Sequence, residues 1–276
     1  MPNKAVTLAR SAHPGPSISV AAIAVILGFG IGLEPWRLVF LGLAFLANQV
    51  SVGLSNDWID ADRDRAVGRT DKPVALGQIG VGAVRTAAFV AAALAIALTI
   101  PLGWAATAAQ LVFLAAGWAY NTVFKSIPFS VVPYIVGFGA LPLVVTLALP
   151  SPALASPWVL LAGALLGVAA HFANVLPDLE DDRATGVRGL PHRVGARASG
   201  LVIAMALAAA SASIVLGPGP APAYDYVGLA LSLLLAIGCA VLVLGGRPTR
   251  LVFRLIIAGA LIDVLLLALS GARLLL

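Results

Sequence analysis

The amino-acid sequence predicts an all-α integral membrane protein with nine transmembrane helices. Three observations support this prediction: an apolar composition, a series of long apolar runs, and basic residues confined to one set of loops. Of the 276 residues, 61% are hydrophobic and 11% are charged, whereas about 25% are charged in a typical soluble domain. A soluble chain of this composition would leave much apolar surface in water, so we expect the bilayer to be its solvent.

Nine apolar runs account for the helices, since each approaches the roughly 20 residues that a transmembrane helix needs. Polar and apolar residues do not alternate at every second position within them, as they would in the strands of a membrane barrel. In chain order the runs are residues 17–33, 36–55, 79–101, 104–124, 131–149, 157–176, 198–216, 224–245 and 251–275.

The basic residues orient these helices. If the N-terminus lies in the cytoplasm and the spans alternate, 15 of the 17 Lys and Arg residues fall on the cytoplasmic side, as the positive-inside rule requires. Only Arg37 and Arg273 fall on the outer side. The net charge of +5 therefore reflects membrane topology in an inner or plasma membrane, and we expect no nucleic-acid partner. The cytoplasmic set is Lys4, Arg10, Arg63, Arg65, Arg69, Lys72, Arg85, Lys125, Arg183, Arg188, Arg193, Arg197, Arg247, Arg250 and Arg254.

Two isolated residues inside the runs have structural interpretations. The single cysteine, Cys239, cannot form a disulfide within the chain and cannot support a cysteine-based zinc cluster. Asp263 is a lone carboxylate in the last run, and we expect it to pair with Arg254 or with a polar group of a neighbouring helix.

The ends of the second and sixth runs carry the same motif. Residues 56–68 and 174–186 both read Asn-x3-Asp-x3-Asp-Arg-Ala-x-Gly, with a constant offset of 118 residues. Such a repeat at two equivalent membrane ends predicts two related halves, residues 17–124 and 131–245. A ninth helix over residues 251–275 then completes a single membrane domain spanning residues 1–276.

The spacing within each motif places oxygen atoms along one face of a helix. Residues four apart lie on the same face, so each motif forms a stripe about 12 Å long at a rise of 1.5 Å per residue. The two predicted stripes are Asn56, Asp60 and Asp64, and Asn174, Asp178 and Asp182.

The carboxylates of the two motifs predict a magnesium site. The motifs and their flanks hold nine of the 12 acidic residues of the chain, and such a cluster is self-repelling unless cations lie within it. Mg²⁺ binds through a few carboxylates together with substrate phosphates, and the absence of His and Cys from the stripes disfavours zinc. Two facing stripes could therefore bridge Mg²⁺ to a diphosphate. The nine residues are Asp57, Asp60, Asp62, Asp64, Asp71, Asp178, Glu180, Asp181 and Asp182.

The motifs resemble those of the UbiA superfamily of intramembrane prenyltransferases. The resemblance rests on the first motif with the following Gly-Arg-Thr-Asp-Lys-Pro at 68–73, on the second motif with Gly186 after it, and on Tyr120-x4-Lys125. It covers nearly the whole chain. It implies nine helices around a central cavity, which the two polar loops cover on the cytoplasmic side.

The resemblance also implies an activity and a set of site residues. Family members transfer an isoprenyl chain from an allylic prenyl diphosphate to an aromatic or lipid-like acceptor and release pyrophosphate. Lys125 would contact the diphosphate with Tyr120 beside it, and Arg69 and Lys72 are placed to contact it too. The residues expected to hold Mg²⁺ against the diphosphate are Asn56, Asp60, Asp64, Asp178 and Asp182.

Two further residues are candidates for substrate binding. Asn174 continues the second stripe, and His171 lies three residues before it on a nearby face. His171 could reach the cavity, or it could instead be a buried histidine that bonds to a neighbouring helix.

Two other functions remain open. A UbiA-type terpene cyclase would use the same residues to ionise a prenyl diphosphate without any acceptor, and the sequence does not separate it from a transferase. A secondary transporter with repeated halves could also use carboxylates, but its site would lie near the bilayer midplane, whereas these carboxylates lie at one membrane end.

Overall fold

The structure is a computed structural model that describes residues 4–179, 182, 186–245 and 250–276. Part of the second motif lies outside the described residues, namely Glu180, Asp181, Arg183, Ala184 and Thr185, and so does Arg247.

The described residues fold almost entirely into helices. The α-helices are α1 (Lys4–Ser11), α2 (Pro14–Gly30), α3 (Pro35–Ile59), α4 (Ala61–Ala66), α5 (Val81–Thr99), α6 (Trp104–Thr122), α7 (Val132–Leu147), α8 (Pro157–Val175), α10 (Leu190–Leu216), α11 (Ala223–Leu244) and α12 (Arg250–Ser270). Short 3₁₀ turns occur at η1 (Ile100–Leu102), η2 (Phe124–Ser126), η3 (Leu176–Asp178) and η4 (Gly271–Leu274).

Proline sets the start of several of these helices. A proline occupies the first turn of α2, α3, α7, α8 and α10, where its missing N–H costs no hydrogen bond and its fixed φ suits a helix. The chain can therefore turn sharply between helices and begin the next one at once.

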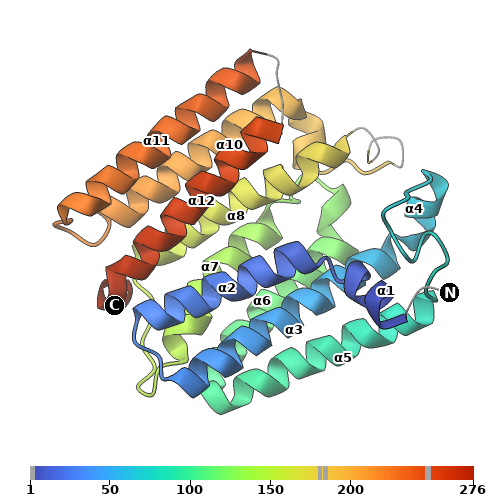
Figure 1. The fold of residues 1–276 in the computed structure, drawn as a ribbon, viewed down its shortest axis with the longest axis horizontal. Coiled ribbons are helices and arrows are strands. Elements are labelled where there is room, and N and C mark those ends of the chain that lie inside the picture. Colours follow the sequence, from blue (N-terminus) through green and yellow to red (C-terminus); the bar gives the residue numbers. More distant parts are fainter. Residues whose placement is uncertain (1–3, 180–181, 183–185, 246–249) are drawn as a thin grey trace.

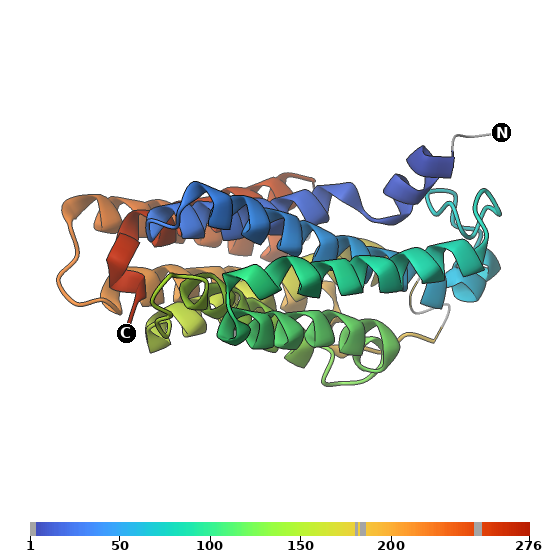
Figure 2. The same ribbon diagram turned by 90° about the horizontal axis from the view of Figure 1, so that it is seen from below.

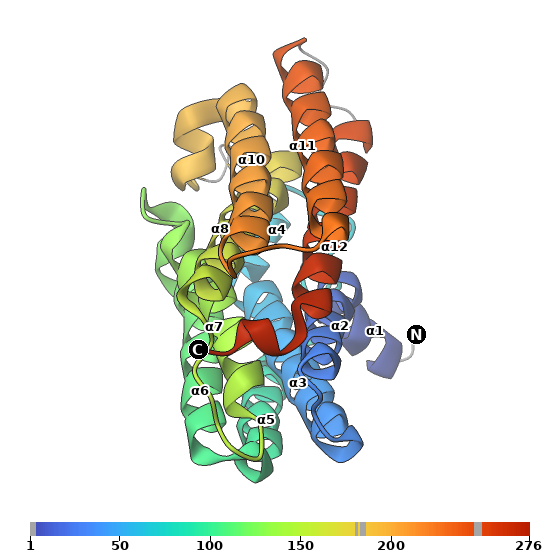
Figure 3. The ribbon, with the colours of Figure 1, turned by 90° about the vertical axis from the view of Figure 1, so that its left-hand side faces the viewer.

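The long helices lie side by side as an elongated bundle (Figures 1 and 2). Helix α3 packs on α2 and α5, α7 packs between α6 and α8, and α10 packs between α8 and α11. Seen from the end that carries the C-terminus, α10, α11 and α12 gather on one side and α3, α5 and α6 on the other (Figure 3). Helix α12 returns to contact α2, which closes the ring.

The bundle contains six helices that are long and apolar enough to cross a membrane within the described residues, or seven if α1 and α2, bent by 64°, count as one span. The expected nine are not confirmed by this criterion. Helix α7 has only 16 residues, and α6, which is not among the six, has polar side chains such as Gln110 and Asn121 buried in the bundle.

Close contact between α7 and α8 depends on two glycines. A Cβ atom on Gly163 would lie 2.4 Å from the carbonyl oxygen of Phe138, and one on Gly167 would lie 2.4 Å from that of Tyr134. Small residues four apart let helix backbones approach closely in membranes. The same glycines therefore position the α7 segment that carries Tyr134 and Phe138.

The two basic residues that depart from the charge pattern both bind other protein groups. Arg37, in the first turn of α3, donates to the carbonyl of Ala148 after α7 at 2.8 Å. Arg273, in η4, pairs with the buried carboxylate of Asp225 on α11 at 3.2 Å. Each arginine joins chain segments that are distant in sequence. These contacts explain why an arginine occurs there, whichever side of the membrane it faces.

Asp263 joins three helices. Its Oδ1 accepts hydrogen bonds from Ser211 of α10 at 2.5 Å and from Ser232 of α11 at 3.3 Å. Polar groups of neighbouring helices thus pair with it, which is one of the two arrangements expected. The side chain of Arg254, the other expected partner, lies outside the described part of the structure.

Candidate active site

The first aspartate motif lies across a helix junction. Helix α3 ends at Ile59 and α4 begins at Ala61, yet the backbone bonds Asp60 N to Asn56 O (2.9 Å) and Asp64 N to Asp60 O (2.8 Å) keep helical spacing through the junction. The side chains remain on one face, where Asn56 Nδ2 donates to Asp60 Oδ2 at 3.0 Å. The predicted first stripe is therefore present.

Both motifs end in the same local structure. Gly68 and Gly186 have φ values of 69° and 82°, a left-handed conformation that favours glycine. The backbone N–H of the next residue returns to an aspartate carbonyl in each case, from Arg69 to Asp64 and from Val187 to Asp182, both at 3.0 Å. This pattern resembles a helix C-cap and explains why each motif needs its glycine.

The two motifs meet at a polar cavity of about 220 Å³. All the predicted site residues except His171 line it, although they come from α3, α4, α6, α8, two 3₁₀ turns, the loop after α4 and, for Asp182, the segment after η3. The lining residues are His13, Asn56, Asp60, Arg63, Asp64, Arg69, Asp71, Lys72, Tyr120, Lys125, Asn174, Val175, Asp178 and Asp182.

Asp60 is the most heavily paired carboxylate of the cavity. It is 5% exposed and accepts from Asn56, from Arg63 at 2.5 Å, and from Lys125 of η2. Opposite charges at these separations compensate for the loss of water around a buried carboxylate. Lys125 and Arg63 thus place two cationic groups beside Asp60 at the wall of the polar cavity.

Arg69 links the loop after α4 to the second motif. Its guanidinium binds Asp71 through two 2.8 Å hydrogen bonds and lies 3.2 Å from Asp178. The Arg69 hydrogen bonds lower the pKa of Asp71 to about 2, and the same bonds raise the pKa of Arg69. Charged groups therefore join the loop after α4 to the second motif.

The oxygen atoms of the cavity fit a magnesium ion. Among the described residues, no three acidic, His or Cys side chains are grouped closely enough to hold a metal by themselves. Mg²⁺ in proteins commonly takes further ligands from water and substrate phosphates. Asp64 Oδ2 is buried without a hydrogen-bond partner, and burial raises the pKa of this carboxyl group. A cation beside Asp64 would satisfy that oxygen.

His171 lies behind the cavity wall. It is fully buried, its Nε2 is 3.0 Å from Ser130 Oγ, and its ring contacts that of Tyr134 at 4.9 Å. It lines none of the three cavities described here. In this structure it supports the aromatic side chains of the wall, and a direct role in substrate binding stays a prediction.

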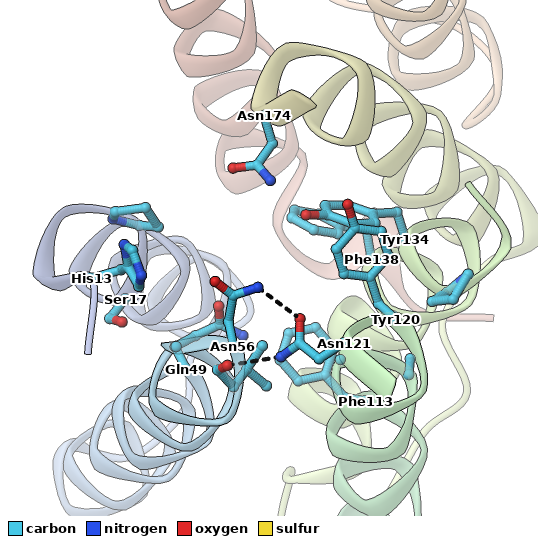
Figure 4. A pocket seen from close by; sticks show the side chains of 17 residues that line it. His13, Ser17, Gln49, Asn56, Phe113, Tyr120, Asn121, Tyr134, Phe138 and Asn174 are labelled. Atoms are coloured by element: carbon cyan, nitrogen blue, oxygen red, sulfur yellow. Dashed lines mark hydrogen bonds between the residues drawn. The ribbon is translucent and has the colours of Figure 1, made fainter. Parts of the chain in front are cut away.

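Two largely apolar cavities lie next to the polar one in the bundle, and Figure 4 shows the one that shares more residues with it. The middle cavity, about 200 Å³, shares four lining residues with the polar cavity: His13, Asn56, Tyr120 and Asn174. The inner cavity, about 330 Å³, is mostly apolar and shares Pro16, Gln49, Tyr134, Phe138 and Asn174 with the middle one. The three cavities therefore adjoin one another, along a path that runs from charged groups to apolar surface.

Several lining residues could not be predicted from the sequence. His13, Gln49, Tyr134 and Phe138 lie in segments without any motif, and only helix packing brings them to the path. Asp57 and Asp62, which belong to the first motif, are not among the predicted stripe residues. Asp57 is 1% exposed and Asp62 is exposed, so the first belongs to the protein interior and the second to the surface.

Comparison with known proteins identifies the family. The UbiA prenyltransferase family matches residues 17–271. The chain belongs to this family. The resemblance seen in the motifs is thereby confirmed, and the chain is a UbiA-family prenyltransferase of the membrane-embedded, all-helical type.

Individual UbiA-family relatives share less than a third of their residues with this chain. The chain is 29% identical over 202 residues, 70% of each chain, to digeranylgeranylglyceryl phosphate synthase from Natronomonas pharaonis. A UbiA homologue from Archaeoglobus fulgidus bound to GPP and Mg²⁺ matches with a TM-score of 0.73 and 18% identity, covering 96% of this chain and 99% of that one. An apo homologue from Aeropyrum pernix matches with a TM-score of 0.69 and 19% identity, covering 95% and 99%. At these identities the structures establish the fold.

Proposed function

We propose that this UbiA-family prenyltransferase moves an isoprenyl chain from an allylic prenyl diphosphate to a hydrophobic acceptor and releases pyrophosphate in a Mg²⁺-dependent reaction. One observation carries the proposal: the two aspartate motifs and Lys125 converge on one polar cavity that shares its wall with an apolar path. A prenyl diphosphate has the same two-part character, with a charged head and an apolar chain.

The charges of the polar cavity suit a diphosphate only in the presence of a divalent cation. Five carboxylates and four Lys or Arg side chains line it, so a diphosphate alone would meet as much repulsion as attraction. The residues that would hold Mg²⁺ are Asn56, Asp60, Asp64, Asp178 and Asp182. Mg²⁺ bound there would stabilise the negative charge that develops on the departing diphosphate.

The side chains of the protein have complementary roles in this proposal. Lys125 and Arg69 donate to diphosphate oxygens and stabilise the same developing charge. A contact from Lys72 stays a prediction, because its Nζ is already bonded to Asp57, Asn56 and His13. Tyr120 lies at the boundary between the polar and middle cavities and orients the reacting carbon. Phe138 and the other apolar residues exclude water from the allylic carbon, which becomes cation-like as the bond to oxygen breaks.

The relatives support this assignment. The homologue from Archaeoglobus fulgidus has been obtained with GPP and with DMAPP, each together with Mg²⁺. The relative from Natronomonas pharaonis is named for a glyceryl phosphate product, which favours a lipid-like acceptor over an aromatic one. A terpene cyclase reaction, without an acceptor, stays the second candidate because the polar cavity would serve it equally well.

We further propose the membrane arrangement that the charge pattern predicts. Nine spans, with α6 and α7 included, place the N-terminus and the polar cavity in the cytoplasm. The C-cap structure repeated at Gly68 and Gly186 supports two related halves, residues 17–124 and 131–245, followed by a ninth helix in a single domain. On this view membrane lipid surrounds the bundle and supplies both hydrophobic substrates.

The test is pyrophosphate release by the purified protein in detergent. Allylic diphosphates of several lengths are offered with Mg²⁺ and with EDTA, to the wild type and to an Asp60→Ala, Asp178→Ala double variant. We expect release that needs Mg²⁺, is lost in the variant, and rises with an added acceptor. Pyrophosphate release at a rate that does not depend on added acceptor would indicate the cyclase. If a folded protein that binds Mg²⁺ released no pyrophosphate, both the transferase and the cyclase would be contradicted.

A further inference from the structure

His13 has a strained backbone at the junction of two helices. It lies between α1 and α2, which are bent by 64°, and its φ and ψ are 50° and 66°. It is the one residue other than glycine with positive φ in the described part of the chain. Such a conformation costs about 1–3 kcal/mol, persists only where the surrounding structure imposes it, and is concentrated at functional sites.

Two buried charges hold the His13 ring in place. Its Nε2 lies 3.2 Å from Asp57 Oδ1 and 2.9 Å from Lys72 Nζ, and Lys72 Nζ also donates to the same Asp57 oxygen at 2.6 Å. Asp57 and Lys72 are 1% and 7% exposed. The ring is therefore anchored through one nitrogen, while Nδ1 makes no hydrogen bond with any described residue.

The anchored ring stands where the polar and middle cavities join. His13 lines both cavities, and its side chain is 40% exposed although its partners are buried. Figure 4 shows it across the middle cavity from Tyr134 and Phe138, near Asn56. A molecule that reaches the diphosphate head from the apolar path would pass this ring.

We propose that His13 is the recognition site for the acceptor, and that its Nδ1 hydrogen-bonds a hydroxyl group next to the reacting carbon. The inference rests on the proposed transferase function and specifies its second substrate. Asp57 and Lys72 act as positioning residues, because they hold the ring that contacts the acceptor.

The local charge favours a neutral hydroxyl over an anionic group. The Lys72 ammonium is already compensated by Asp57, so this side of the cavity offers no spare positive charge. A hydroxyl both donates and accepts hydrogen bonds, so it pairs with Nδ1 in either tautomer of the ring. An alcohol of a lipid and a phenol of an aromatic acceptor share this chemistry, and the experiment distinguishes them.

The experiment compares three variants of the full-length protein in detergent. His13→Gly removes the ring and relieves the positive φ, His13→Asn places an amide near the position of Nδ1, and His13→Gln places one near that of Nε2. Wild-type protein is offered geranylgeranyl diphosphate, Mg²⁺ and one of three acceptors: a monoprenylglyceryl phosphate, a long-chain monoalkylglycerol, or 4-hydroxybenzoate. Steady-state kinetics with the acceptor of highest turnover then give KM for each substrate.

We expect His13→Gly to raise the acceptor KM about tenfold, as loss of one hydrogen bond does, while the KM for the prenyl diphosphate stays within twofold. His13→Asn should recover most of the loss and His13→Gln should not. The inference is overturned if both KM values rise together, if Gln rescues and Asn does not, or if no hydroxyl acceptor supports turnover. Wild-type protein that fails to release pyrophosphate at all would instead refute the proposed function.

Discussion

Replacing Lys125 with methionine separates two effects that depend on its ammonium group. Lys125 lines the polar cavity, its side chain is 15% exposed, and it pairs with Asp60. Asp60 retains Asn56 and Arg63 as donors in the variant, so we expect the fold to persist. Changes in activity and in metal affinity can then be assigned to the lost charge.

The two effects have opposite signs. Loss of one positioned group that stabilises developing charge costs about 2.7–4 kcal/mol, which lowers kcat by about 10²- to 10³-fold. Without substrate, however, Lys125 competes with Mg²⁺ for Asp60. Two unit charges at 4 Å interact by about 4 kcal/mol at an effective dielectric constant of 20. Partial exposure and the remaining Arg63 reduce this, so we expect Mg²⁺ affinity to rise about tenfold, or about 1.4 kcal/mol.

The assay combines Mg²⁺ titration of the substrate-free protein by calorimetry with pyrophosphate release at saturating prenyl diphosphate. Arg65→Met is the control, because Arg65 lines none of the three cavities. Its partner is Asp62, whose side chain is 98% exposed. The control variant should leave both quantities unchanged. A Lys125→Met protein with kcat within threefold of wild type, or with weaker Mg²⁺ binding, would refute the reasoning.

Three further predictions test other parts of the structure. Asp64→Asn should raise or preserve the thermal stability of the metal-free protein. Burial raises the pKa of Asp64 in the folded protein, so ionisation of this carboxyl group lowers the stability of the wild type as pH rises through the folded-state pKa. The stabilisation that Mg²⁺ gives the wild type, measured by thermal unfolding, should be lost in the variant. Ala170→Phe narrows the inner cavity, so kcat/KM should fall more for long prenyl diphosphates than for geranyl diphosphate. Asp263→Ala leaves Ser211 and Ser232 without their shared partner and should cost about 1–3 kcal/mol, seen as a lower Tm with both KM values unchanged.

Each of these predictions has a clear contrary result. Undiminished Mg²⁺ stabilisation of Asp64→Asn would remove Asp64 from the metal site. Equal losses for all chain lengths in Ala170→Phe would mean that the inner cavity does not hold the isoprenyl chain. An altered KM for the acceptor or for the prenyl diphosphate in Asp263→Ala would show that the packing of α10, α11 and α12 around Asp263 affects substrate binding.

Much of the candidate site could be predicted because its chemistry is encoded locally. Asn56, Asp60 and Asp64 are four residues apart, and helical spacing alone places them on one face. Their repetition at Asn174 and Asp178 identified the second wall of the cavity. Tyr120 and Lys125, at the cytoplasmic end of the fourth run, were found only through the family resemblance, because their own spacing carries no comparable signal.

The membrane class and the aspartate motifs were determined by the sequence itself, because hydropathy and residue spacing act over a few turns of helix. Only the tertiary structure decided which side chains surround the apolar path. Tyr134 reaches it because Gly167 lets α7 approach α8, and His13 reaches it because Asp57 and Lys72, 44 and 59 residues away, hold its ring. Such contacts depend on how whole helices pack, and no local pattern records that packing.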